Sequence, residues 1–144
     1  MAQAPGKNFL LVVGILYVVF GSLGLLTSAG GIATADYWDR VLPTANDMSW
    51  SVYYTITLIG SFFHILVGVM GLINRACLDK ASILKMLGII DIGYVILGAI
   101  LSTAVFAGAL GGIAAILSLV FGAVLPILYL IGAHKNHSAY TLNN

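Results

Sequence analysis

Residues 51–103 read SVYYTITLIGSFFHILVGVMGLINRACLDKASILKMLGIIDIGYVILGAILST, two long apolar runs joined by a short polar turn at residues 74–80. A helix needs about 20 mostly apolar residues to cross a membrane, and each run is that long. The stretch therefore predicts a hairpin of two transmembrane helices, at about residues 51–73 and 82–106.

The hairpin carries one ionisable residue deep in each run, His64 and Asp91. Each lies nine residues from the turn, about 13 Å at the 1.5 Å rise per residue of a helix. An aspartate at a helix centre costs about 2.5–3.5 kcal/mol to insert, so it is normally kept inside a bundle with a partner. Because two tyrosines fall at a similar depth, we predict an intramembrane polar cluster of Asp91, His64, Tyr17 and Tyr94. Tyr129 falls close to a predicted span end and is expected to be an interfacial anchor.

The composition of the whole chain supports the membrane assignment. Of its 144 residues 60% are hydrophobic and 8% are charged, and the mean hydropathy is +1.06, whereas soluble domains carry about 25% charged residues. The net charge of +1, without a basic tract, argues against nucleic-acid binding. The single Cys77 excludes an internal disulfide, CxxC redox chemistry and a Cys-based metal site.

Two further apolar runs, at about residues 8–29 and 111–133, complete one all-α domain over residues 1–144, a four-transmembrane-helix bundle. The first run has a cleavable signal peptide as its alternative, but it is longer than the usual apolar core of a signal peptide, so we interpret it as a span. Residues 107–112 are expected to form a tight uncharged turn. Pro126 is the predicted kink of the fourth span, and the polar tail from His134 is expected to be frayed.

The basic residues predict the orientation of the bundle. In a four-span alternation only Arg40 falls on one side, and five fall on the other: Lys7, Arg75, Lys80, Lys85 and Lys135. The positive-inside rule then predicts an N-in/C-in protein of the plasma (inner) membrane, with both termini cytoplasmic.

The loop at residues 30–49 would then lie outside, with a short interfacial helix over residues 34–42. Four aromatic side chains at this end are predicted to be interfacial anchors: Trp38, Trp50, Tyr53 and Tyr54. A binding surface for an external ligand or partner is the alternative interpretation of these residues.

Small residues recur at steps of three and four along one face of every predicted span, and such faces let helix backbones approach closely. The predicted helix-packing seam comprises Gly14, Gly21, Gly24, Gly60, Gly68, Gly71, Gly88, Gly98 and Gly122. A chain this short buries little of its own surface, so we expect self-association or a membrane-protein partner through any seam left uncovered. The similarity of residues 14–21 to 115–122 is compatible with an inverted duplication or with chance in an apolar sequence.

These features leave two main hypotheses for function. The first is a non-enzymatic membrane protein that acts through helix–helix association, as a homo-oligomer or accessory subunit, in which the polar cluster only fixes the packing. The alternative is a small transporter or ion/proton pathway that uses the Asp91/His64 pair. Catalysis is less favoured because no motif places a nucleophile beside the pair. Two residues are too few for a metal centre, and we predict no metal and no cofactor. A polar cavity reaching the pair would favour the pathway.

Overall fold

The computed structural model describes residues 4–42, 44, 48–106 and 108–142, and all regular structure among them is helical. The elements are α1 (Lys7–Ala33), α2 (Ala35–Val41), α3 (Trp50–Asn74), the 3₁₀ turn η1 (Leu78–Lys80), α4 (Ala81–Val105), α5 (Gly108–Gly122) and α6 (Val124–Leu142). Four described stretches are long and apolar enough to cross a membrane: α1, α3, η1 with α4, and α5 with α6. The prediction of an all-helical bundle with four membrane-spanning candidates is confirmed.

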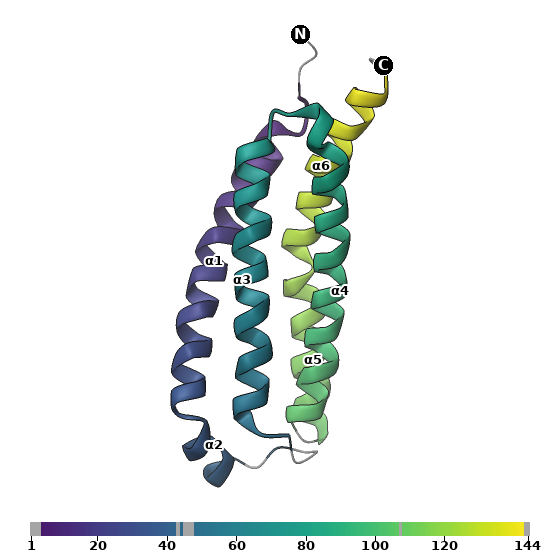
Figure 1. Ribbon diagram of the computed structural model, residues 1–144. Helices are drawn as coiled ribbons and strands as arrows, with labels where there is room; N and C mark the ends of the chain where they lie inside the picture. The colour runs from purple at the N-terminus through teal and green to yellow at the C-terminus, as the bar shows by residue number, and fades with distance from the viewer. Residues whose placement is uncertain (1–3, 43, 45–47, 107, 143–144) are drawn as a thin grey trace.

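Both termini lie at one end of the bundle, and α2 lies at the other (Figure 1). We call these the terminal end and the loop end. Helix α1 packs along α3, α4 packs along α5 and α6, and the two pairs meet through α1 with α6 and α3 with α4. The structure is therefore two helix pairs laid side by side.

Glycines set the close approach of α1 to α3. Gly14 and Gly68 face each other, and a β-carbon on Gly68 would lie 2.7 Å from the carbonyl oxygen of Gly14. One to two turns further along, a β-carbon on Gly21 would lie 2.7 Å from the Ile65 side chain. Small residues at these positions let the two backbones touch. The seam on α1 is thus filled by another helix of the same chain.

The fourth span is interrupted between α5 and α6. Proline has no N–H to bond the carbonyl four residues earlier, and its ring crowds that carbonyl. For Pro126 that carbonyl belongs to Gly122, where α5 ends. The helical hydrogen bond from Ile127 N to Ala123 O, at 3.0 Å, is kept, so the chain continues in a helix after a one-residue break.

The expectation of a frayed tail from His134 is wrong, because α6 continues to Leu142. Asn136 explains this difference: its fully buried side chain accepts a hydrogen bond from Gly6 N at 2.7 Å and donates one to Arg75 O at 2.9 Å. The turn expected at residues 107–112 is shorter than predicted, since α5 begins at Gly108; residue 107 itself lies outside the described residues.

At the loop end Trp50 is buried instead of facing an interface. Its indole N–H donates to Leu42 O at 2.7 Å, and its backbone N–H donates to Asp39 Oδ1 at 2.9 Å. Four further aromatic rings surround it, those of Trp38, Tyr53, Tyr54 and Phe106. Of the predicted anchors, Trp38 is exposed, and Tyr53 and Tyr54 are half-buried. This aromatic cluster fastens α2 to the start of α3; the predicted loop residues 43 and 45–47 lie outside the described residues.

Candidate functional site

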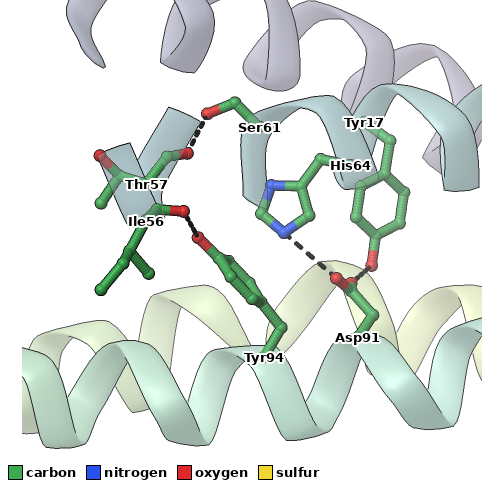
Figure 2. Close-up of polar contacts among 7 residues, drawn as sticks. All are labelled: Tyr17, Ile56, Thr57, Ser61, His64, Asp91 and Tyr94. Carbon is green, nitrogen blue, oxygen red and sulfur yellow. Dashed lines mark hydrogen bonds and ion pairs between the residues drawn. The ribbon is translucent and has the colours of Figure 1, made fainter. Parts of the chain in front are cut away.

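Asp91, at the middle of α4, is fully buried, and side chains from three helices meet there. The Tyr17 hydroxyl of α1 donates a hydrogen bond to Asp91 Oδ2, and His64 Nε2 of α3 lies 3.1 Å from Oδ1 (Figure 2). A buried carboxylate without partners would be costly, so these contacts explain how the chain tolerates an acid at this depth. The structure brings together three of the four residues of the predicted cluster.

The two contacts of Asp91 differ in kind. The contact to Tyr17 has hydrogen-bond geometry, whereas Oδ1 makes no hydrogen bond of standard geometry among the described residues. The separation of 3.1 Å between His64 Nε2 and Oδ1 is nevertheless well within the range of an ion pair. His64 and Asp91 therefore form an ion pair when the imidazole is protonated.

Tyr94, the fourth predicted member, points away from Asp91. Its hydroxyl donates to Ile56 O at 3.2 Å, and its ring packs edge-on to the His64 ring with 5.5 Å between centroids (Figure 2). Gly60 makes room for it, because a β-carbon there would overlap the Tyr94 hydroxyl. Tyr94 therefore positions the imidazole and does not bind the carboxylate.

Tyr129 of α6 belongs to the cluster, and its expected role as an interfacial anchor is wrong. It is fully buried, and its ring lies edge-on to Tyr17 at a centroid distance of 5.7 Å. Its hydroxyl has no hydrogen-bond partner among the described residues. Helical spacing does indicate this placement, because Tyr129 lies seven residues after Gly122 of the predicted seam and three after Pro126, on one helix face. Every candidate span thus contributes at least one side chain to the cluster.

The bundle is closed between this cluster and the terminal end. The core there consists of apolar side chains that are at most 2% exposed: Leu10, Val13, Val67, Leu84 and Ala133. Half-buried leucine, methionine and phenylalanine side chains pack around them. Such a core leaves no room for a polar solute.

Towards the loop end a half-open cavity lies between the helices. It has a volume of about 300 Å³ and extends from His64 to Tyr53, eleven residues nearer the start of α3. Hydroxyl groups line it, from Tyr53, Thr57, Ser61, Tyr94, Ser102 and Ser118. The side chain of His64 is 29% exposed, whereas that of Asp91 behind it is not exposed at all. The imidazole therefore separates the cavity from the carboxylate.

A second, apolar chamber of about 550 Å³ lies at the level of the cluster, beside the break between α5 and α6. Gly122, Pro126 and Asp91 are among the residues that line it. His64 and Phe20 line both this chamber and the hydroxyl-lined cavity. The imidazole is thus the one ionisable group in contact with both spaces, among the residues the structure describes.

Each of the nine predicted seam glycines faces another helix of the same chain. Six are buried, and Gly24, Gly98 and Gly122 are half-buried, where their nearest neighbours are Ser61, Ser118 and Val95. The seam therefore packs the chain against itself.

Within the described residues no group of three or more His, Cys, Asp or Glu side chains is placed to hold a metal ion. Comparison of the chain with known protein families, with curated protein sequences and with solved structures finds no match. Its function is therefore inferred from the geometry. In that geometry one nitrogen of His64 faces a buried aspartate, and the ring lines a cavity that also contains hydroxyl-bearing side chains. A histidine placed in this way is suited to proton exchange.

Proposed function

We propose that the protein is a small membrane transporter or proton pathway, in which the His64–Asp91 pair binds and releases the transported or coupling proton. The observation that supports this proposal is the hydroxyl-lined cavity, which reaches His64 from the loop end while packed side chains fill the opposite half. Intramembrane ionisable residues commonly serve such pathways.

The two nitrogens of His64 suggest how a proton would move. Nε2 faces Asp91, and Nδ1 lies on the side of the ring towards Ser61 and Thr57 (Figure 2). Both of these residues line the cavity. A proton taken up at Nδ1 makes the ring cationic, and the ring can then release the proton on Nε2 to the carboxylate. The Tyr17 hydroxyl keeps Oδ2 fixed during this exchange. Release towards the terminal end would need the two helix pairs to part there, which is a change of alternating-access type.

The same proposal includes the orientation of the protein in its membrane. Five of the six Lys and Arg residues lie beside the terminal end, so we place that end and both termini in the cytoplasm and the loop end outside. The cavity would then face the outside of a plasma (inner) membrane, and α2 would lie along the outer surface.

Self-association is the second candidate function. The glycine seam no longer supports it, because the seam is filled within the chain. What favours it is the fourth span, of which only 11% is buried, against 28–33% for the other three. A second copy packed against α5 would cover that face.

Proton flux into liposomes tests the proposal. The purified protein is reconstituted, a potassium gradient with valinomycin sets the membrane potential, and a trapped dye reports the internal pH. We expect the rate of proton flux to be higher with the wild-type protein than in protein-free liposomes. With Asp91→Asn the rate should fall to that of protein-free liposomes. Asp79→Asn is the matched control, since its carboxylate is exposed in the turn and pairs with Lys80, at 3.7 Å, far from the cavity. Equal rates for wild type and empty liposomes, or for wild type and Asp91→Asn, would reject proton movement through the pair.

A further inference from the structure

A groove of about 480 Å³ runs between α4 and α6 near the terminal end. Its walls are apolar and consist of Ile89, Ile127, Leu130 and Ile131, and its rim carries Lys85, His134 and Lys135. The isoleucines at 89, 127 and 131 are exposed on the outside of the bundle. Helical spacing produces this arrangement, because Lys85 and Ile89 are four residues apart, as are Ile127, Ile131 and Lys135.

Within the part of the chain that the structure describes, the charges on this rim have no counterion. Among the described residues, no carboxylate lies within ion-pair distance of Lys85 or Lys135, and Asp79, the one acid near this end, contacts Lys80 instead. The chain contains no Glu. Lys135 Nζ lies 4.5 Å from the centroid of the Phe9 ring, which fixes its position without neutralising its charge.

We propose that this groove binds an anionic phospholipid, with the phosphate at Lys85, His134 and Lys135 and an acyl chain along the isoleucine wall. Positive charge at one end of an open hydrocarbon groove is complementary to a lipid that carries both a phosphate and a chain. A soluble anion would match only the rim. Basic pockets between transmembrane helices on the cytoplasmic side recognise anionic headgroups in this way. The inference is independent of proton movement and holds whether or not the His64–Asp91 pair conducts.

Native mass spectrometry of the purified protein in detergent tests the site. Phosphatidylglycerol and phosphatidylcholine with identical chains are titrated separately, and the ratio of their dissociation constants is measured. We expect wild type to prefer phosphatidylglycerol, and Lys85→Gln/Lys135→Gln to lose about 10- to 30-fold of that preference. The control Lys7→Gln/Lys80→Gln removes the same charge from the same end, off the groove, and should keep the preference.

Ile127→Trp supplies a second variant that leaves every charge in place and obstructs only the chain portion of the groove. It should weaken binding of both lipids, and circular dichroism checks that each variant is folded. Three outcomes would overturn the proposal: no preference in wild type, an equal loss in the Lys7/Lys80 control, or a preference unchanged in Lys85→Gln/Lys135→Gln. Displacement of bound lipid by inorganic phosphate alone would also overturn it, since that result describes an anion site without a hydrocarbon component.

Discussion

Two tyrosines of the cluster allow the contribution of a single hydroxyl group to stability to be measured. Tyr17 and Tyr129 are both at most 1% exposed, and their rings pack against each other. The Tyr17 hydroxyl donates to Asp91 Oδ2, whereas the Tyr129 hydroxyl has no partner among the described residues. Replacing each with Phe removes only the hydroxyl. The same chemical change therefore breaks a hydrogen bond at Tyr17 and breaks none among the described residues at Tyr129.

The expected free energies of unfolding follow from this difference. A hydrogen bond to a charged group contributes about 1.5–3 kcal/mol in soluble proteins, and interhelical hydrogen bonds in membranes contribute about 0.6 kcal/mol on average and at most about 1.7. Tyr17→Phe leaves a buried carboxylate oxygen without its donor, so we expect a loss of about 1–2 kcal/mol. Tyr129→Phe removes a buried hydroxyl that pairs with nothing, so we expect no loss, or a gain of up to about 1 kcal/mol.

Reversible unfolding in mixed micelles, followed by circular dichroism as the denaturing detergent is increased, measures both values. The double variant should show additive effects if the two hydroxyls act independently. Equal losses in the two single variants, or a larger loss for Tyr129→Phe, would refute the assignment of Tyr17 as the donor to Asp91.

Three further changes test the packing. Gly68→Ala should destabilise the protein by about 1–3 kcal/mol, because the added β-carbon meets the α1 backbone. The control Gly93→Ala, with open space around it, should be neutral or stabilising by up to about 1 kcal/mol. The reverse order of stability in a thermal unfolding assay would contradict close packing of α3 on α1 at Gly68. Asn136→Ala should lower the stability by about 1–3 kcal/mol, because two hydrogen bonds are lost. It should also speed amide exchange at the start of α1, and unchanged exchange would show that Asn136 does not hold α1 in place. Pro126→Ala gives residue 126 an N–H that can donate to Gly122 O, so α5 and α6 should join into one continuous helix. Amide exchange at residues 123–126 should then slow, and unchanged exchange would show that the proline does not cause the break.

The spans were predictable because hydropathy and length depend on the local sequence alone. The same holds for the depth of His64 and Asp91, which follows from counting residues at a fixed rise. The helical tail was missed because it depends on Asn136, whose partners are more than 60 residues away in the chain. Hydropathy falls at residue 133 and predicts the end of the span there, which places Tyr129 near an interface. Its helical spacing from Gly122 and Pro126 instead predicts a side chain that faces the bundle.

The cavity could not be predicted from sequence. It depends on how far apart the two helix pairs lie towards the loop end, and this separation is set by many contacts at once, including the Trp50 aromatic cluster. Hydroxyl residues such as Thr57 and Ser61 are common in transmembrane helices, where they bond the preceding turn, as both do here. Their presence on one face therefore does not by itself distinguish a polar cavity from a packed interface.

A proton pathway from the loop end needs water beside Ser61, which lies one turn from His64. The most direct measurement is therefore whether a water-soluble thiol reagent labels Ser61→Cys in a Cys77→Ser background. A membrane-impermeant methanethiosulfonate is added to sealed liposomes, and the exposed Cys77 of the wild-type chain, at the terminal end, reports which side faces out. Labelling of Ser61→Cys from the loop-end side, with none of the fully buried control Val67→Cys, is the predicted result. No labelling of Ser61→Cys, or labelling only from the terminal side, would contradict a pathway that opens at the loop end.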